Sequence, residues 1–486
     1  MTTATLPPMS AADLALLTPE LVLVGGAFAL MILDLFISNR NKVWTHLISV
    51  LLLAVVLLLV ATGVGGEGTG FGGLFVRDTA ANVMKAVIVL VTGLTLVYGF
   101  SYLRERKLFQ GEIPVLILFA TAGMMVLVSA GSLLMVYLGL ELLALSSYAL
   151  VASNRDSGKS SEAAMKYFVL GSLASGLLLY GMSLVYGAVG TLNLAEINAA
   201  IATTDEGMLL MTGAVFLLAG VAFKLGAAPF HMWLPDVYQG APAPIAMFIS
   251  SAPKLAAFGM AYRLLEVGVG GLSDALQLML AVLAVVSLVV GNLMAIAQTN
   301  LKRMLAYSTV SHIGFLLLGI AGGNQDGYAA ALFYAITYTL MSTASFGAII
   351  VLSRKGFEAE TLEDFKGLSC RNPWMAALVL VIMASLAGAP PLLGFFAKMF
   401  VLSAAVKGGL LWLAIVGVVM SVIGAFYYLR VVKVMYFDEP VGEPLPANDD
   451  RLIGIVLGVN SLMLLVLAAA FNPILAWCQQ AFAHLA

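Results

Sequence analysis

The 486-residue chain has little charge for its length. Asp, Glu, Lys and Arg make up 10% of it, whereas a soluble protein carries about 25%. A water-exposed surface of ordinary chemistry therefore cannot be built, and a soluble globular fold is excluded. The net charge of −2 argues neither for nor against nucleic acid, and because long basic runs are missing we expect no nucleic-acid partner.

Cysteine, metal-ligand and nucleotide signatures are also scarce. The two cysteines, Cys370 and Cys478, fall on opposite sides of the expected topology, so we expect no disulfide between them, and no metal-ligand or P-loop spacing occurs. Gly63, Gly65 and Gly68 form a nominal G-x-G-x-x-G, but no strand precedes them, which predicts a flexible linker rather than a nucleotide site. No Lys or Arg precedes the first apolar run, so we do not expect a cleavable signal peptide.

What the chain has in abundance is hydrophobic residues, at 61%, in recurring runs long enough to cross a membrane as helices. The short alternating segments of a transmembrane barrel are missing. We therefore predict an all-α, polytopic membrane protein of about fourteen transmembrane helices. The predicted ranges are 18–37, 43–63, 78–101, 113–129, 132–152, 162–189, 207–229, 242–265, 273–297, 302–321, 327–353, 374–406 (interrupted), 410–436 and 451–476.

Lys and Arg in the short connections predict the orientation, because such residues concentrate on the cytoplasmic side. Sixteen fall on one side and three on the other, which places both termini outside. The sixteen are Arg40, Lys42, Arg104, Arg106, Lys107, Arg155, Lys159, Lys302, Arg303, Arg354, Lys355, Lys366, Arg371, Arg430, Lys433 and Arg451. The three are Arg77, Arg263 and Lys407.

The remaining basic residues lie inside predicted helices, together with one glutamate. A charge at the bilayer centre costs about 2.5–3.5 kcal/mol on insertion scales, so such residues usually mark an ion or proton pathway. Lysine suits a proton relay because burial disfavours its charged form, whereas a nearby carboxylate favours it. These residues are Lys85, Glu141, Lys166, Lys224, Lys254 and Lys398.

Prolines stand close to three of the lysines and predict broken helices. Broken backbone at bilayer depth is tolerated only inside protein or beside water, and it flanks ion sites in transporters. We expect Lys224 at the negative end of one half-helix, which favours its charged form. Lys398 is expected near the positive start of another half-helix, which favours proton release.

Each residue also has a purely structural interpretation. Lys85 is equally well explained by a side chain that reaches the interface, whereas Lys166 beside Glu162 favours function. Glu141, Lys224, Lys254 and Lys398 would otherwise be ion pairs that lock helices together. His312 lies among polar residues and suits a bridge between Lys254 and Lys398, although a lone membrane histidine is often only a hydrogen-bonding contact between helices. His231 is expected near the cytoplasmic end of the seventh helix, where it would serve an entrance, and Asp34 is expected at the interface.

Three long motifs carry a resemblance to a known family. They are FKLGAAPFHMWLPDVYQGAPAP (223–244), GNLMAIAQTNLKRMLAYSTVSHIGF (291–315) and LAGAPPLLGFFAKMFVL (386–402). With them the chain resembles, over nearly its whole length, the antiporter-like membrane subunits of respiratory complex I, the NADH–quinone oxidoreductase. It lacks the long lateral helix of subunit L and has Lys398 where subunit M typically has glutamate. Among the three antiporter-like subunits of the complex, these two differences favour the one that is neither L nor M.

The resemblance implies two inverted five-helix repeats, with helices 7 and 12 discontinuous. The repeats would span residues 113–265 and 273–436, after three N-terminal helices (1–112) and before a C-terminal helix (451–486), all in one membrane domain.

The resemblance also implies roles for the buried residues. Glu141 would pair with Lys224, Lys254 would relay, His312 would link the halves, Lys398 would be the terminal site, and Lys166 would stand near the input.

The family further implies a proton-translocating subunit in the bacterial inner membrane. It would contact a neighbouring antiporter-like subunit, small membrane subunits and lipid. No cofactor is expected in this chain, because FMN, the iron–sulfur clusters and the quinone site belong to other parts of the complex. The alternatives are a subunit of a cation/proton antiporter or membrane-bound hydrogenase of the same fold, and a scaffold whose charges only pin helices.

Overall fold

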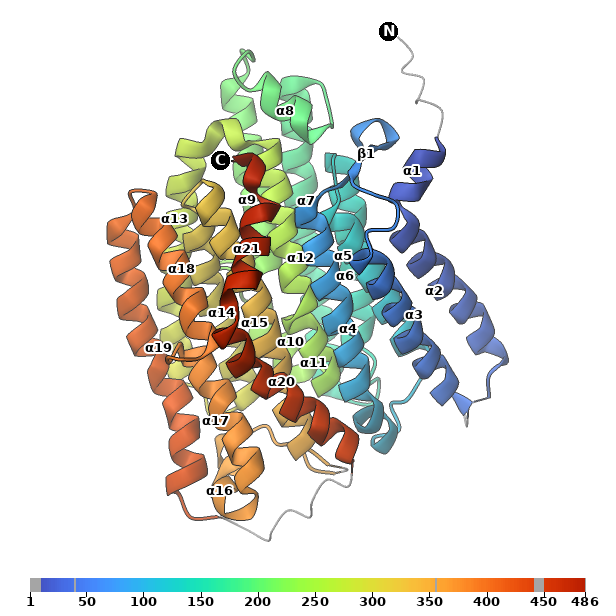
Figure 1. The fold of residues 1–486 in the computed structure, drawn as a ribbon, viewed down its shortest axis with the longest axis vertical. Coiled ribbons are helices and arrows are strands. Elements are labelled where there is room, and N and C mark those ends of the chain that lie inside the picture. The colour runs from blue at the N-terminus through green and yellow to red at the C-terminus, as the bar shows by residue number, and fades with distance from the viewer. Residues whose placement is uncertain (1–9, 39–40, 355, 441–449, 486) are drawn as a thin grey trace.

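The computed structural model describes residues 10–38, 41–354, 356–440 and 450–485. It is a bundle of long helices with two three-residue strands (Figure 1). The helices in chain order are α1 Ala11–Leu16, α2 Thr18–Phe36, α3 Val43–Ala61, α4 Thr79–Glu105, α5 Glu112–Val128, α6 Leu133–Val151, α7 Gly158–Val189, α8 Leu194–Ala200, α9 Gly207–Leu225, α10 Trp233–Gly240, α11 Ala243–Ser250, α12 Ala252–Ala261, α13 Ser273–Ile296, α14 Leu301–Ile320, α15 Gln325–Leu352, α16 Leu368–Arg371, α17 Pro373–Ala387, α18 Leu393–Lys407, α19 Leu411–Phe437, α20 Arg451–Ala469 and α21 Phe471–Ala481.

All fourteen predicted spans are present. In the described part of the chain, 12 helices are long and apolar enough to cross a membrane, and two shorter apolar helices, Glu112–Val128 and Pro373–Ala387, account for the other two. Longer spans such as α4 reach past the predicted ends. The predicted all-α fold of about fourteen spans is therefore confirmed.

Basic residues gather at one end of the bundle. Connections alternate between the lower end of Figure 1, which carries α16, and the upper end, which carries α1 and the end of α21. Arg40 and Lys355 lie outside the described residues, and the other fourteen residues of the larger set lie at the lower end or in its adjoining helical turns. Arg77, Arg263 and Lys407 lie at the upper end. The charge asymmetry therefore follows the two faces of the bundle.

Two spans are broken at the positions that the prolines predicted. Helix α9 ends at Leu225 with Gly226 in the left-handed region (φ 86°), and α17 ends at Ala387 with Gly388 in the same conformation (φ 83°). Glycine adopts this conformation without steric cost and ends a helix there. The prediction that the seventh helix runs on to residue 229 is wrong, because this cap ends it four residues earlier.

A third break lies beside Lys254, where Pro253 predicts one, whereas a π-helix and a break in the C-terminal span were not predicted. Ser251 separates α11 from α12 with non-helical angles (φ −113°, ψ −95°), one residue after the end of α11, and Pro253 then sits in the first turn of α12. A seven-residue π-helix, Tyr262–Gly268, follows α12. The C-terminal span also divides at Ala470 into α20 and α21.

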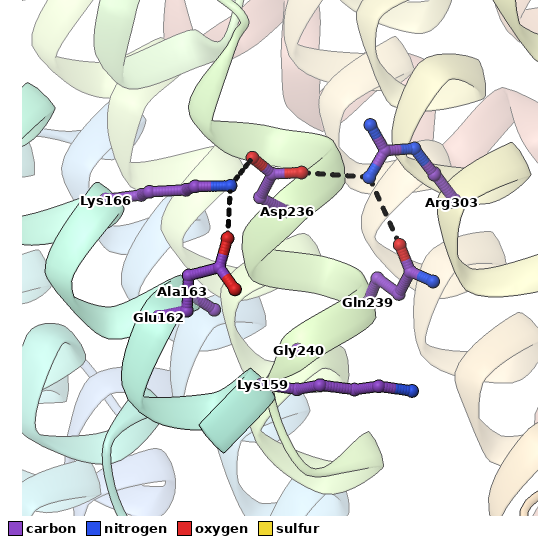
Figure 2. A pocket seen from close by; sticks show the side chains of 8 residues that line it. All are labelled: Lys159, Glu162, Ala163, Lys166, Asp236, Gln239, Gly240 and Arg303. Atoms are coloured by element: carbon purple, nitrogen blue, oxygen red, sulfur yellow. Dashed lines mark hydrogen bonds and ion pairs between the residues drawn. The ribbon is translucent and has the colours of Figure 1, made fainter. Parts of the chain in front are cut away.

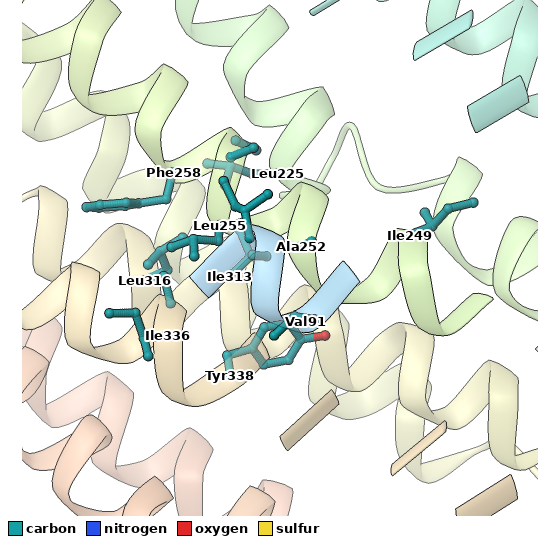
Figure 3. Close-up of a cluster of buried hydrophobic side chains, with 14 of the residues drawn as sticks. Val91, Leu225, Ile249, Ala252, Leu255, Phe258, Ile313, Leu316, Ile336 and Tyr338 are labelled. Atoms are coloured by element: carbon teal, nitrogen blue, oxygen red, sulfur yellow. The ribbon is translucent and has the colours of Figure 1, made fainter. Parts of the chain in front are cut away.

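The central helices are buried on every side. In the 18-residue apolar stretch of each span, every residue of Ala243–Gly268 is buried inside the protein, as are 94% of the residues of α14 and 89% of those of α15. In α19 only 33% of these residues are buried. Figure 3 shows Leu225, Leu255, Ile313 and Leu316 packed around this centre, with the ring of Tyr338 at the lower edge of the cluster. Charges on the central helices therefore lie in a low-dielectric medium.

The N-terminal helices hold a buried ion pair. Lys85 Nζ on α4 lies 2.6 Å from Glu20 Oε1 on α2, and the two side chains are 0% and 4% exposed. The interpretation of Lys85 as a side chain that reaches the interface is therefore wrong. The predicted linker after the second helix is also structured, because Gly68–Gly70 (β1) pairs antiparallel with Phe75–Arg77 (β2).

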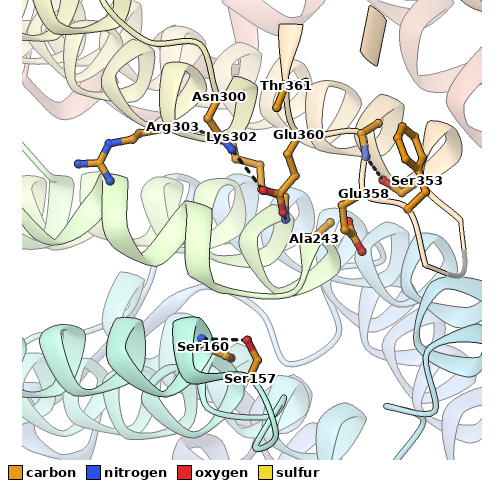
Figure 4. Close-up of polar contacts among 12 residues, drawn as sticks. Ser157, Ser160, Ala243, Asn300, Lys302, Arg303, Ser353, Glu358, Glu360 and Thr361 are labelled. Atoms are coloured by element: carbon orange, nitrogen blue, oxygen red, sulfur yellow. Dashed lines mark hydrogen bonds and ion pairs between the residues drawn. The ribbon is translucent and has the colours of Figure 1, made fainter. Parts of the chain in front are cut away.

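The long connection between α15 and α17 is tied to the lower end of α14. Lys302, which is 2% exposed, lies 3.0 Å from Glu360, and the Asn300 amide donates to the same carboxylate (Figure 4). The backbones of Asn300 and Thr361 form an isolated antiparallel β-bridge beside this ion pair. The connection therefore holds the start of α14, the helix that carries His312.

Candidate functional site

Lys254 reaches the broken end of α9. Its ammonium donates a hydrogen bond to the Leu225 carbonyl at 2.8 Å and lies 3.5 Å from the Lys224 carbonyl. The Ala222 and Phe223 carbonyls are already satisfied, because the Gly226 and Ala227 amides donate back to them. An ammonium on α12 thus binds the carbonyls that the helix end would leave without a partner. The same ammonium lies 4.6 Å above the Trp233 ring.

Lys398 makes the corresponding contact at the broken end of α17. Its ammonium donates to the Ala387 carbonyl at 2.8 Å and to Ser421 Oγ on α19 at 3.0 Å. Leu225 and Ala387 are the last residues of their half-helices, and a left-handed glycine follows each. The prediction that Lys398 feels the positive start of the next half-helix is wrong, because its long side chain extends back to the negative end of α17.

Gly226 and Gly388 also leave room for these ammonium groups. A Cβ at Gly226 would lie 3.2 Å from Lys254 Nζ, and a Cβ at Gly388 would lie 2.8 Å from Lys398 Cδ. Both glycines therefore serve a left-handed turn and the close approach of a lysine. The two breaks share this construction, although one lysine comes from a neighbouring helix and the other from the second half of the broken helix itself.

Lys224 lies in the last turn of α9, at the negative helix end that was predicted for it, and is buried. It lines a small cavity between α6, α7 and α9 with Tyr148 and Tyr167. The space of about 10 Å³ suffices for roughly one water molecule. Glu141 on α6 was expected to pair with Lys224, but the two side chains form no ion pair in this structure, and Glu141 Oε1 is buried without a hydrogen-bond partner among the described residues.

His312 lies at the centre of a chain of hydroxyl groups. Its Nδ1 is 2.6 Å from the Tyr334 hydroxyl and its Nε2 is 3.0 Å from the Tyr428 hydroxyl. Tyr428 is also hydrogen-bonded to Ser308, one turn earlier on α14. Lys398 lies near the same helix, because its ammonium is 5.0 Å from the centroid of the Phe315 ring, three residues after His312 on α14. Sequence reasoning found the histidine but not the tyrosines, which come from α15 and α19.

Lys166 lies at the lower end of α7, in a cavity of about 240 Å³. Its ammonium is 2.8 Å from Glu162 and 2.9 Å from Asp236, and the other oxygen of Asp236 is 2.8 Å from Arg303 (Figure 2). Asp236 on α10 thus joins two cations below the break in the seventh span. Sequence reasoning missed Asp236, although its position seven residues after Pro229 was a usable signal.

His231 does not stand at an entrance. It lies in the turn between α9 and α10, half-buried, with its ring centroid 6.2 Å from that of Tyr307. The prediction that placed it near the cytoplasmic end of the seventh helix is wrong, because the span continues beyond the histidine as α10, from Trp233 to Gly240. Asp34 pairs with Lys42 at 2.6 Å near the lower end of α2, in keeping with an interfacial position.

Ion pairing does not explain the central charges. Among the described residues, Glu141, Lys224, Lys254 and Lys398 take part in no ion pair, whereas Lys85 does. The structural alternative of ion pairs that lock helices therefore fails for those four. Lys254 and His312 share no hydrogen-bond partner in the described chain, so a proton that passes between them needs water or a rearrangement.

Known proteins resemble this chain over its whole length. Residues 130–424 match the family model described as NADH:quinone oxidoreductase/Mrp antiporter, TM. NADH-quinone oxidoreductase subunit N from Xanthomonas euvesicatoria pv. vesicatoria (strain 85-10) is 76% identical over 486 residues, which cover 100% of both chains. The chain belongs to the subunit N family of NADH-quinone oxidoreductases.

Two solved structures show the same fold as this member of the subunit N family. A chain of respiratory complex I from Thermus thermophilus with bound aureothin is 31% identical, with a TM-score of 0.81 over 94% of this chain and 98% of that one. A chain of the Mrp complex from Dietzia sp. DQ12-45-1b is 23% identical, with a TM-score of 0.85 over 98% of both chains, and shows the fold alone. The resemblance to antiporter-like complex I subunits, with their inverted repeats, is therefore confirmed.

Proposed function

We propose that this subunit N family member moves protons along its row of buried charges while the complex around it oxidises NADH and reduces quinone. The observation that carries the assignment of residues is the pair of broken helices. At each break a buried lysine donates to the last carbonyl of the half-helix, at 2.8 Å, in the interior of the bundle.

The breaks suit proton transfer because one feature of each break stabilises the charged form of the lysine and another stabilises the neutral form. A helix end presents partial negative charge, which stabilises an ammonium, whereas burial favours the neutral amine. The two effects oppose each other, so a modest change at the break would shift the lysine between holding and releasing a proton. Movement of the Glu141 charge or entry of water would supply such a change.

The order of the groups in space suggests the route. Protons would enter at the lower end through the cavity of Lys166 and reach Lys224, whose charged form Glu141 favours. Lys254 is adjacent, because its ammonium lies 3.5 Å from the Lys224 carbonyl. His312 and its tyrosines would then pass the proton to Lys398, the terminal site in this chain.

Orientation and organisation follow the same proposal. The lower end, rich in Lys and Arg, would face the cytoplasm of a bacterium and both termini the periplasm, with the chain in the inner membrane. The two repeats would span residues 113–265 and 273–436, after residues 1–112 and before 451–486. This chain would hold no cofactor of its own, and FMN, the iron–sulfur clusters and quinone would act elsewhere in the complex.

A cation/proton antiporter is the second candidate, because the family model spans both types of protein. Coupling distinguishes them. In the proposed role, proton uptake into inverted membrane vesicles follows NADH addition and stops when quinone reduction is blocked. An antiporter would instead exchange sodium for protons without electron flow. Each charge moved against the potential costs about 2.3 kcal/mol per 100 mV, which the redox reaction must supply.

The residue assignment is tested with Glu141→Ala and Lys224→Ala in the assembled complex. We expect both to lower proton pumping and quinone reductase activity together, because the two are coupled. Lys433→Ala is the control, since that side chain is 63% exposed at the lower end of α19 and lies off the route. If both variants retained full pumping and full quinone reductase activity, the relay would be wrong.

A further inference from the structure

A cavity of about 730 Å³ opens at the lower end of the bundle, away from the row of buried charges. It lies between the end of α15, the short α16 and the first turns of α17 and α20, which pack side by side (Figure 1). None of the residues of the proton route lines it. The cavity therefore needs a separate explanation.

The described residues around the lower part of this cavity are rich in arginine. Arg354, Arg371 and Arg451 line it, with Asp450 as the only acidic residue among its described lining. Asp450 caps α20, because one of its oxygens accepts from the Leu452 and Ile453 amides, and Ser101 binds the other. Two helices also begin here, α17 and α20, and a helix start carries partial positive charge. The lower part therefore favours an anion.

The upper part of the cavity is apolar. It continues along α20 past Ile455 and Val459 to Leu462, with Trp374 of α17 opposite. From Arg451 to Leu462 the helix rises about 16 Å, close to the thickness of one leaflet, which is half of a hydrocarbon core of about 30 Å. Trp374 is 58% exposed, as tryptophan at the membrane–water interface commonly is.

Glycines on α20 leave the groove open. Gly454 and Gly458 lie one turn apart on the cavity wall, and a Cβ at Gly454 would meet no atom within 4 Å. A Cβ at Gly458 would come only as near as 3.9 Å to Trp374. The described residues thus leave space beside the backbone of α20 at the depth of acyl chains.

We propose that this cavity, lined by Arg354, Arg371, Arg451 and the apolar face of α20, binds an anionic phospholipid from the adjoining leaflet. The phosphate would lie between the guanidinium groups, which recognise phosphate through paired hydrogen bonds. One acyl chain would follow the groove between Trp374 and Ile455. Basic pockets between membrane helices are a known means of recognising such headgroups.

The alternative occupant is a membrane helix of a neighbouring subunit, because small residues one turn apart also let helices approach. The distribution of charge favours a lipid. Guanidinium groups lie at headgroup level with an apolar wall above them, which matches a molecule with an anionic head and hydrocarbon chains. A helix would have to place carboxylates beside the arginines at this depth.

The test uses the purified NADH–quinone oxidoreductase that carries Arg371→Gln and Arg451→Gln together. Thermal unfolding is followed while phosphatidylglycerol or phosphatidylcholine in detergent is added to delipidated complex. Each basic residue near a membrane contributes about 1 kcal/mol to anionic lipid binding, so the double variant should bind phosphatidylglycerol about 30-fold more weakly. The control is Arg155→Gln, whose side chain is 77% exposed elsewhere at the lower end and should behave as wild type.

A second variant separates the headgroup from the chains. Gly454→Leu fills the open groove and leaves all three arginines in place, so it should also abolish the stabilisation by phosphatidylglycerol. Equal stabilisation of wild type and both variants would overturn the proposal. Stabilisation by inorganic phosphate alone would reduce the site to a simple anion site. A density map with a protein helix in the groove would show that the other occupant is correct.

Discussion

Lys398→Met removes the terminal proton site while it keeps nearly the same side-chain length. In the protein, the Lys398 ammonium bridges the Ala387 carbonyl on α17 and Ser421 on α19, and the residue is 8% exposed. Methionine fills this space but can neither carry a proton nor bind the carbonyl. The variant therefore tests whether the contact at the break serves proton transfer or only packing.

The two consequences differ in magnitude. Loss of the ammonium leaves a buried carbonyl without its partner, which costs about 1–3 kcal/mol. Removal of a buried charge offsets part of that cost, so we expect the complex to assemble with little loss of stability. A positioned proton-transfer group contributes about 10²- to 10⁴-fold to the rate of its step. Proton transfer through this site should therefore become slower than turnover.

The assay compares two rates in inverted membrane vesicles, NADH oxidation and proton uptake reported by a pH-sensitive dye, at equal amounts of assembled complex. We expect Lys398→Met to lower both rates by at least about tenfold. Lys407→Met is the matched control on the same helix, because Lys407 is 63% exposed and pairs with Asp326 at 2.7 Å. A Lys398→Met complex that pumps at the wild-type rate would refute the assigned role.

Three further variants test other parts of the structure. Gly226→Ala forces alanine into a left-handed turn, at about 1–2 kcal/mol, and places a methyl group 2.2 Å from Leu234 Cδ1 and 3.2 Å from the Lys254 ammonium, so both must shift. It should lower proton uptake, whereas Gly176→Ala, with nothing within 4 Å, should not. Glu20→Gln should destabilise the protein by about 3–5 kcal/mol in thermal unfolding, because Lys85 is left charged and buried, and replacing Lys85 by Met as well should restore most of the loss. Asp236→Asn breaks two partly exposed ion pairs worth about 0–1 kcal/mol each, so initial proton uptake should fall less than about tenfold; an unchanged rate would remove Asp236 from the entrance.

The fold was predictable because a membrane simplifies the relation between sequence and structure. An apolar run must become a helix in lipid, since each backbone polar group needs a partner within the segment. Prolines at 229 and 390–391 marked the two breaks for the same reason, because proline cannot continue the helical hydrogen bonds. The helix ends were less accurate. Ser251 interrupts its span two residues before Pro253, the proline that marked this break, and the signal that ends α9 is a glycine at 226 rather than the proline after it.

The site was predictable in its charged members and not in their contacts. Glu141, Lys254 and Lys398 stand out in sequence because charge in an apolar run is costly. Tyr334 and Tyr428, which bind His312, do not stand out, since tyrosine is common in membrane helices. Their role depends on three helices meeting, and nothing local in the chain records that meeting.

By itself, the sequence determined the spans, the two faces of the bundle, the breaks beside the prolines and the charges on the central helices. Each of these depends on local chemistry, which is the free energy of placing a residue type in lipid or in a helix. The sequence did not determine the burial of three basic residues that it assigned to connections, Arg77, Arg263 and Lys302. The tertiary structure alone decided which carbonyl each lysine binds. It brought Lys254 to the end of α9 and turned Lys398 back to the end of α17. The sequence could not decide this, because a lysine side chain is long enough to reach any of several partners. The tertiary structure also separated Lys85, which is paired with Glu20, from the lysines that have no carboxylate partner.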